Sequence, residues 1–213
     1  MERLICVCIG YIFGLVQTSY LYGKLNNIDI REHGSGNAGT TNALRTLGWR
    51  AGAVTFLGDC LKCVLAVLLV RAIFASSHAE ELPLLAMYAG VGTVIGHNYP
   101  FYLKFRGGKG IAVTAGLILS TNLVMTAIAL VVFVTLVATT KYVSVGSLAV
   151  VFLFLVEVVI YGQKGGFQME PSLLYELYTV VVLLVILTVM KHRENIKRLV
   201  KGTENKIGTK RAK

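Results

Sequence analysis

Charged side chains are scarce in this chain of 213 residues. Asp, Glu, Lys and Arg make up 15% of it, whereas hydrophobic residues make up 55%. A soluble domain carries about 25% charged residues, so this composition excludes an ordinary water-soluble domain. The chain is therefore predicted to lie in lipid.

Several motifs that mark common enzyme classes are also missing. There is no G-x-S-x-G elbow and no His followed by Asp at the H-x-x-x-x-D spacing of acyltransferases that use thioester donors. The GGKG at 107–110 lacks the spacing and the Ser or Thr of a P-loop. The four cysteines lie in apolar runs with no histidine at metal-ligand spacing. We expect no covalent intermediate on the protein, no metal and no cofactor.

The alternation of polar and apolar residues that a membrane β-barrel needs is absent as well. The apolar residues form continuous runs, and six of these are close to the 17 to 25 residues that cross a bilayer as a helix. The six runs are 4–23, 51–74, 82–99, 123–139, 143–161 and 173–190. A seventh, 111–119, is too short to span and predicts a short or broken helix. We therefore expect an all-α polytopic integral membrane helix bundle with about seven transmembrane segments.

Lysine and arginine cluster on one side of such a bundle. They follow the first, third and fifth spans and fill the segment 191–213, whereas Arg3, Arg71 and Lys164 fall on the other side. Cytoplasmic loops carry the excess of positive charge, so the N-terminus is predicted outside and the C-terminus in the cytoplasm. The first run is too long for a signal peptide and lacks a small-residue cleavage site. We expect one membrane-embedded domain over 1–213, with 191–213 as a basic cytoplasmic tail.

The net charge of +10 is confined to the loops that flank these runs. It indicates membrane orientation and attraction to anionic lipid, and no nucleic-acid partner is expected. Three charged residues lie more than three positions from either end of a span: Asp59, Lys62 and Glu157. Such residues are expensive in lipid and are functional candidates. The i, i+3 spacing of Asp59 and Lys62 predicts either a structural pair that shapes a site or direct contact with substrate; Glu157 has no assigned role.

Two glycine-rich polar segments interrupt the apolar runs: HGSGNAGTTNALR at 33–45 and GHNYPFYLKFRGGKG at 96–110. Glycine lets backbone N–H groups approach a ligand closely. Positive charge comes from Arg45, Lys104, Arg106 and Lys109. Together these features predict a cradle for a phosphate or a carboxylate.

In the first segment, Thr40 or Thr41 is expected to cap a short helix that Gly48 ends. The helix start would offer N–H groups to a phosphate, with Ser35, Asn37 and Asn42 as further polar ligands. In the second segment, His97 sits at a helix end. It is either a general base or the partner in a structural hydrogen bond.

The sequence resembles one family in three places. GSGNAGTTNALR, GHNYPFYLKFRGGKG and KHRENIKRLVKGTENK are similar to the three cytoplasmic motifs of the bacterial acyl-phosphate:glycerol-3-phosphate acyltransferase family. The likeness extends over essentially the whole chain. It departs at Thr40, where alanine is more usual, and at Tyr99, where phenylalanine is, and neither change removes a phosphate ligand.

This resemblance implies a reaction. A fatty acyl group would move from acyl phosphate to the 1-hydroxyl of sn-glycerol 3-phosphate, giving lysophosphatidic acid and phosphate, as an early step of phospholipid synthesis. The enzyme would lie in the bacterial plasma membrane with its active site facing the cytoplasm. The family also implies a functional partnership with an enzyme that produces acyl phosphate.

The resemblance also implies roles for particular residues. Catalytic roles fall on Ser35, Asn37, Arg45 and Lys109. Substrate-binding roles fall on Thr41, Asn42, Lys104, Gly107, Gly108, Gly110, Ser144, His192 and Asn195. Glu204 is expected to be structural.

Two other functions fit parts of the pattern. A membrane transporter for a phosphorylated small molecule would also use broken helices and glycine-rich ion sites, but it should show inverted repeats, and the two halves show no obvious repeat. A scaffold for anionic lipid would need only the basic tail.

Overall fold

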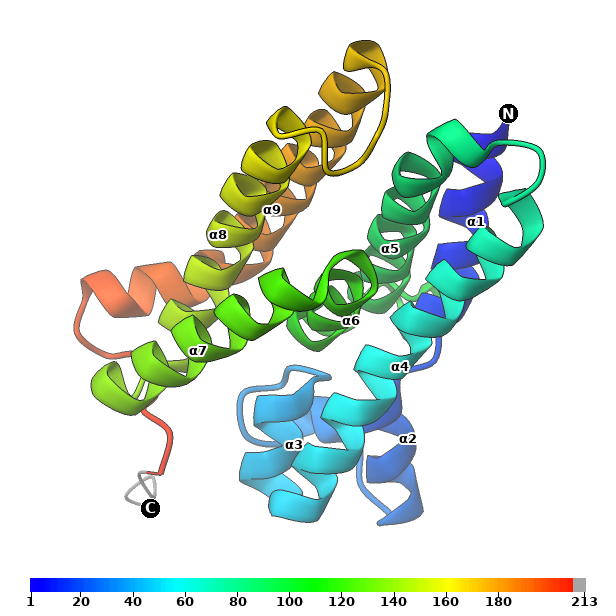
Figure 1. The fold of residues 1–213 in the computed structure, drawn as a ribbon. Helices are drawn as coiled ribbons and strands as arrows, with labels where there is room; N and C mark the ends of the chain where they lie inside the picture. The colour runs from blue at the N-terminus through cyan, green and yellow to red at the C-terminus, as the bar shows by residue number, and fades with distance from the viewer. Residues whose placement is uncertain (209–213) are drawn as a thin grey trace.

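The computed structural model describes residues 1–208, and these form a bundle of helices without a strand (Figure 1). The first half of the chain contains α1 (Glu2–Gly14), α2 (Thr18–Leu25), η1 (Ile30–Glu32), α3 (Thr40–Leu47), α4 (Trp49–Phe74), η2 (Ala79–Glu81) and α5 (Leu82–Asn98). The second half contains η3 (Phe101–Leu103), α6 (Ile111–Thr121), α7 (Leu123–Thr140), α8 (Val143–Gln163) and α9 (Pro171–Val200).

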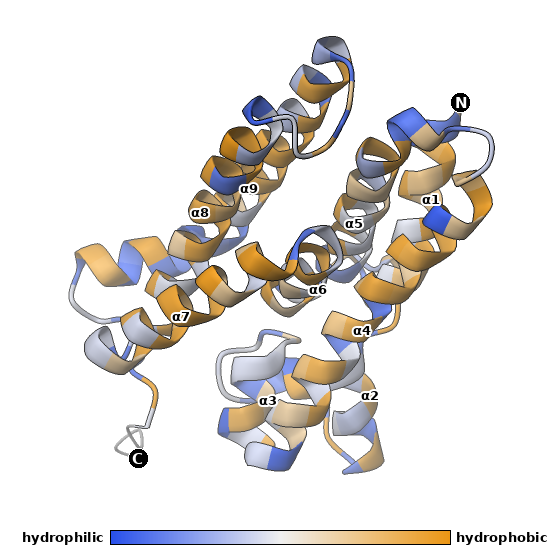
Figure 2. Cartoon of the chain, in the orientation of Figure 1, coloured by the Kyte–Doolittle hydropathy of each residue, from blue (hydrophilic) through white to orange (hydrophobic). Residues whose placement is uncertain are grey.

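Five stretches are long and apolar enough to cross a membrane: Glu2–Leu25, Trp49–Phe74, Leu123–Thr140, Val143–Gln163 and Pro171–Lys191. Figure 2 shows these helices mainly in the colour of hydrophobic residues, with polar residues gathered toward their ends. The expected all-α membrane bundle is thus confirmed for the described residues. A count of seven would require α5, with 17 residues, and α6, with 11, to cross as well.

The helices form two arms. In Figure 1, α8 and α9 run side by side as one arm, and α1, α4 and α5 form the other, with α6 and α7 between them. The packing of α1 on α5 is very close, because a Cβ placed on Gly10 would lie 2.0 Å from the carbonyl oxygen of Ala89. Small residues allow this approach in lipid, where dispersion contacts drive helix association.

The first span is broken, although the sequence predicts one continuous run over 4–23. α1 ends at Gly14 and α2 begins at Thr18. Lipid offers no water to the carbonyl groups freed by a break, so protein groups must bind them. Gln17 Nε2 donates to the carbonyl of Gly14 at 3.2 Å, and Lys62 Nζ donates to that of Val16 at 2.6 Å. The intervening carbonyl, of Leu15, accepts from the hydroxyl of Tyr102 at 2.6 Å.

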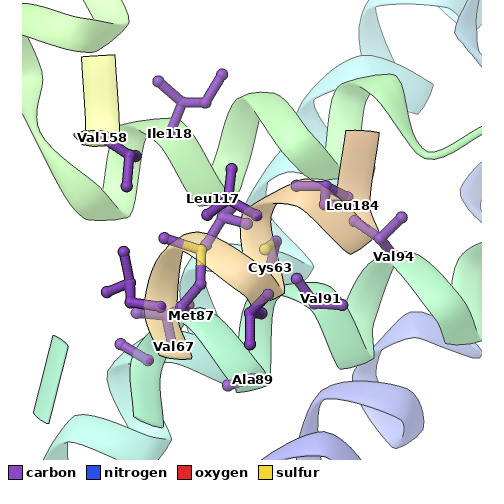
Figure 3. Close-up of a cluster of buried hydrophobic side chains, with 14 of the residues drawn as sticks. Cys63, Val67, Met87, Ala89, Val91, Val94, Leu117, Ile118, Val158 and Leu184 are labelled. Atoms are coloured by element: carbon purple, nitrogen blue, oxygen red, sulfur yellow. The ribbon is translucent and has the colours of Figure 1, made fainter. Parts of the chain in front are cut away.

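The core lies where the two arms meet. Figure 3 shows side chains from α4, α5, α6, α8 and α9 packed together, among them Cys63, Met87, Leu117, Val158 and Leu184. Cys63 is fully buried in this apolar cluster and its thiol is free. It acts as a small core residue.

The last helix is longer than the apolar run that predicts it. α9 continues from Pro171 to Val200, so the first ten residues of the segment expected as a tail, 191–200, are helical. His192 and Asn195 therefore lie on a rigid extension of a membrane helix, and both are buried.

Candidate functional site

A cavity of about 680 Å³ opens among the first glycine-rich segment, the start of α6, the start of α8 and the end of α9. Ten predicted site residues line it: Ser35, Asn37, Thr41, Asn42, Arg45, Lys109, Gly110, Ser144, His192 and Asn195. They come from segments up to 160 residues apart in the chain, so the fold gathers all three polar motifs around one space.

Three predicted residues do not line this cavity. Lys104 is exposed, with a left-handed backbone (φ 55°). Gly107 and Gly108 instead pack on the end of α5, and their N–H groups donate to the carbonyls of Asn98 (3.3 Å) and His97 (3.1 Å). A Cβ on Gly107 would lie 2.0 Å from the carbonyl oxygen of His97. The glycine pair thus lets the loop pack against the helix, and its predicted contact with substrate stays a prediction.

The first segment forms a loop and a short helix. α3 runs from Thr40 to Leu47 and Gly48 ends it with φ 87°, as expected. The expected threonine cap is wrong, because Thr40 is already helical and the cap residue is Gly39, without a side-chain hydrogen bond. The first turn of a helix leaves N–H groups without intrahelical partners, and Gly39 and Thr41 both line the cavity.

Asn42 holds this loop in shape. Its Oδ1 accepts from the backbone N–H of Ser35 at 2.8 Å, and its Nδ2 donates to the carbonyls of Ile30 (3.0 Å) and His33 (2.9 Å). Asn42 is buried, whereas Ser35 is exposed to the cavity. Asn42 therefore positions the neighbouring polar residue.

Lys109 brings a cation to the start of α6. Its Nζ donates to Asn195 Oδ1, which links the second motif to α9. Burial lowers the pKa of Lys109 to about 8, with the nearby carboxylate of Glu204 opposing the shift and Arg198, Lys191 and Arg45 adding to it. The ammonium group is therefore poorly neutralised within the protein.

His192 is held as a neutral imidazole. Its Nδ1 lies 2.8 Å from the carbonyl of Thr188, and because a carbonyl only accepts, Nδ1 donates. Burial, followed by the charge of Lys109, lowers the pKa of His192 to about 4. Its Nε2 is consequently left as an acceptor on a residue that lines the cavity.

Glu204 closes the site from the segment after α9. Its carboxylate accepts from Ser144 Oγ (3.0 Å), Asn195 Nδ2 (2.6 Å) and Arg198 Nε (2.7 Å). Burial acts to raise the pKa of Glu204, but these hydrogen bonds together lower it. The contacts fit the expected structural role, since one carboxylate orients side chains from α8 and α9.

Sequence reasoning missed other lining residues. Arg198 lies three residues after Asn195 and six after His192, a spacing that places all three on one helix face. Lys191 lines the cavity too, and its Nζ donates to the carbonyl of Asn98 at 3.1 Å. The helical spacing within the third motif would have indicated Arg198, but no sequence signal pointed to the partner of Lys191.

The charged residues inside the spans behave differently from one another. Lys62 and Asp59 form an ion pair at 2.8 Å, and Asp59 lines the cavity. Within the described residues, both carboxylate oxygens of Glu157 are buried without a hydrogen-bond partner.

Cations exceed their partners around the cavity. Asp59 is paired with Lys62, Glu194 with Lys197 and Glu204 with Arg198, but within residues 1–208 Arg45, Lys109 and Lys191 form no salt bridge. Lys109 and Lys191 are half-buried and Arg45 is exposed, and cations without a carboxylate partner favour an anionic ligand. Fold and site together define a membrane-embedded helical protein with a cavity lined by cations that lack a carboxylate partner.

Comparison with known proteins gives the family. Residues 4–202 match the model of the glycerol-3-phosphate acyltransferase family. The chain is 44% identical to the glycerol-3-phosphate acyltransferase of Clostridioides difficile, over 98% of this chain and 97% of that protein. It is 39% identical to that of Thermoanaerobacter sp., over 99% and 98%. The chain therefore belongs to the glycerol-3-phosphate acyltransferase family and is an acyltransferase, not the transporter considered as the alternative.

A solved structure agrees. The crystal structure of PlsY (YgiH), an integral membrane glycerol 3-phosphate acyltransferase, in its glycerol 3-phosphate form matches this chain with a TM-score of 0.83 and 27% identity, covering 98% of this chain and 97% of that one. The lysophosphatidic acid form of the same protein matches with a TM-score of 0.81.

Proposed function

We propose that this enzyme transfers a fatty acyl group from acyl phosphate to the 1-hydroxyl of sn-glycerol 3-phosphate, releasing lysophosphatidic acid and phosphate. The observation that carries the choice of donor is the set of unpaired cations around one cavity. A single glycerol 3-phosphate needs fewer cations than Arg45, Lys109 and Lys191 together supply. An acyl phosphate would bring the second phosphate, and its activated acyl group would need no nucleophilic side chain.

Each substrate is assigned to one side of the cavity. Ser35, Asn37 and Arg45 would line the reacting centre, with Arg45 paired to a phosphate. His192 and Asn195, on one face of α9, would bind glycerol 3-phosphate, and the free Nε2 of His192 would accept a hydrogen bond from a glycerol hydroxyl.

The donor phosphate would lie between α6 and α8. Ser144 is close to the start of α8, and Gly110 lines the cavity as the N-cap residue of α6. Lys109 would bridge the charge of the two substrates. Because the N–H groups of Gly107 and Gly108 are already bonded to α5, we assign the donor to the Lys109 side chain rather than to those two amides. Thr41 would bind the phosphate from the first turn of α3, and Asn42 would act by holding Ser35, since both N–H groups of its amide already donate to backbone carbonyls. Lys104, which does not line the cavity, would add positive charge from outside it.

Catalysis would come mainly from proximity and charge neutralisation. Holding two anions together in a basic cavity aligns the hydroxyl with the acyl carbonyl and stabilises the charge that develops on the oxygen atoms. The 1-hydroxyl oxygen forms the new ester bond, the bond from the acyl carbon to the phosphate oxygen breaks, and a phosphate oxygen takes the proton. His192 is a poor base for this step, since its pKa of about 4 leaves it with little affinity for a proton.

We also propose the membrane arrangement. Seven segments would cross the bilayer if α5 and α6 are counted, with the N-terminus outside and the cavity and the C-terminus in the cytoplasm, as the distribution of Lys and Arg favours. The whole of 1–213 would be one domain in the bacterial plasma membrane. An enzyme that makes acyl phosphate would supply the donor.

The test measures phosphate release by the purified enzyme in detergent, with palmitoyl phosphate and with or without glycerol 3-phosphate. We expect release that requires glycerol 3-phosphate and yields lysophosphatidic acid. Arg45→Ala should abolish it, whereas Arg50→Ala should not, because Arg50 is exposed and stacks on Trp49 outside the cavity. Turnover with palmitoyl-CoA but not with palmitoyl phosphate would overturn the assignment of the donor.

A further inference from the structure

A buried lysine beside the cavity uses all three of its hydrogen-bond donors. Lys62 is 4% exposed, and its Nζ lies 2.6 Å from the carbonyl of Val16, 2.8 Å from Asp59 Oδ1 and 2.8 Å from His97 Nδ1. An ammonium group has three N–H donors and no acceptor. The three contacts therefore satisfy Lys62 completely, and Asp59 supplies the compensating charge.

This arrangement determines the state of His97. Because Lys62 can only donate, Nδ1 of His97 must accept, and a neutral imidazole then carries its proton on Nε2. Asp59 Oδ1 also accepts from Thr18 at 3.1 Å, so the carboxylate is anchored on α2 as well as on Lys62. The backbone of His97 is held too, since its carbonyl accepts from Gln17 Nε2 at 3.0 Å.

The protonated Nε2 lies where the two glycine-rich segments meet. A Cβ placed on Gly108 would lie 2.1 Å from His97 Nε2 and 2.6 Å from the carbonyl oxygen of Ala38. Gly108 is thus wedged between the imidazole and the first segment. His97 is 3% exposed and still lines the cavity, next to the loop that ends in Lys109.

We infer that Asp59 and Lys62 are positioning residues of the active site, which hold His97 as an Nε2–H donor at the junction of the two segments. His97 in this state is not the general base, because the nitrogen near the cavity already carries a proton. Its N–H keeps the Lys109 loop in register with the loop that bears Ser35. The kinetic tests below rest on the proposed acyl phosphate donor.

Two substitutions test the acceptor role of His97 Nδ1 and the donor role of Nε2 separately. Asparagine places an amide oxygen near the position of Nδ1, so His97→Asn keeps an acceptor for Lys62 but has no donor at the junction. Glutamine reaches the position of Nε2, so His97→Gln restores the donor but removes the acceptor that Nδ1 offers to Lys62.

We expect His97→Asn to melt near the wild type yet lose about 100-fold in kcat/KM through misplacement of the loop. His97→Gln should melt lower but stay within about 10-fold of the wild type in kcat/KM. An active His97→Asn, or equal losses in both variants, would overturn the inference.

A second experiment distinguishes positioning from folding. Lys62→Met alone leaves Asp59 as an unpaired buried charge and should unfold readily, whereas the double variant Asp59→Asn with Lys62→Met removes both charges. We expect the double variant to recover thermal stability but to remain about 10-fold or more below the wild type in kcat/KM, with most of the change in kcat. If activity returns together with stability, the pair is merely structural.

A spectroscopic measurement is independent of the donor. In protein labelled with ¹⁵N-histidine, the signals lost in His97→Asn should come from an imidazole that is protonated on Nε2 and bare on Nδ1. A proton found on Nδ1 would overturn the inference. If the wild type makes no product from acyl phosphate, the proposed donor fails, and this measurement still decides the state of His97.

Discussion

Charged residues gather in two regions of this bundle, near the start of α1 and around the cavity. In the first, Arg3 binds Glu176 through two hydrogen bonds of 2.5 and 2.9 Å and lies 3.0 Å from Glu81. The hydroxyl of Tyr88 donates to the same Glu176 at 2.8 Å. Glu176 precedes Asn195 by 19 residues on α9, so the two regions are about 28 Å apart along the helix.

The two regions differ in how their charges are balanced. The arginine near the N-terminus has two carboxylate partners, and the contacts join α1, η2, α5 and α9. Around the cavity, Arg45, Lys109 and Lys191 have no carboxylate in salt-bridge contact within residues 1–208. In the sequence, glycine-rich motifs mark Arg45 and Lys109, but nothing shows which charges of either region have a carboxylate partner. The presence of carboxylate partners therefore distinguishes the structural cluster around Arg3 from the cavity, where unpaired cations favour an anion.

The comparison is tested most severely at Lys109. We expect Lys109→Met to lower kcat/KM by about 10³-fold, because a preorganised positive charge at the reacting phosphates is removed. Lys164→Met is the matched control, since Lys164 is exposed beyond the end of α8. Initial rates with both substrates varied measure the effect. A loss of less than threefold would show that Lys109 does not serve the reaction.

Gly108 tests whether close packing shapes the site. The methyl group of Gly108→Ala would collide with His97 Nε2 and with the carbonyl of Ala38, so the Lys109 loop must move. We expect a loss of about 100-fold in kcat/KM. Gly165→Ala is the control: it has a positive φ of 76° and no atom within 4 Å of the added carbon, so it should weaken folding without slowing turnover. Equal kinetic effects in the two variants would contradict this account.

The pH dependence of the reaction tests the charge on Lys109. The pKa of Lys109 is lowered to about 8, so the ammonium loses its proton as the pH rises through that value. In the free enzyme kcat/KM should then fall about 10-fold per pH unit above about 8. Lys109→Arg keeps its charge over this range and should lose this limb of the profile. An unchanged limb in that variant would assign it to another group.

The smallest effect is expected at the cluster around Arg3, where each charge has a partner. Arg3→Gln removes both ion pairs at a site that is about one-third exposed, so the loss of unfolding free energy should be about 1 kcal/mol. This would lower the midpoint of thermal unfolding by about 2–4 °C. Calorimetry in detergent and a kcat assay measure the two quantities. A large fall in kcat without a change in melting would show that the two clusters do not differ as described.

Much of the fold could be predicted from the sequence. The runs at 51–74, 123–139 and 143–161 became α4, α7 and α8 with shifts of a few residues, because continuous apolar length directly reflects the thickness of a bilayer. The break between α1 and α2 could not be predicted. It depends on Gln17, Lys62 and Tyr102, which bind the freed carbonyls, and two of these lie far from the break in sequence.

The site was predicted less evenly. Arg45, Lys109 and His192 line the cavity as expected, because the motifs that contain them combine polar side chains with glycine in an apolar chain. The glycines at 107 and 108 have bare backbone, as expected, but it faces His97. A glycine has the same sequence signature whether a ligand or a neighbouring helix approaches it.

By itself, the sequence determined the class of the protein and the chemical nature of its ligand. Apolar length and the placement of Lys and Arg depend on local composition alone, and anion-binding residues keep their chemistry in any fold. Only the tertiary structure decided which charges have a partner and which groups surround each nitrogen of His97. Both depend on contacts between residues distant in the chain, such as Lys62 with Val16 and His97, and such contacts exist only after the helices have packed.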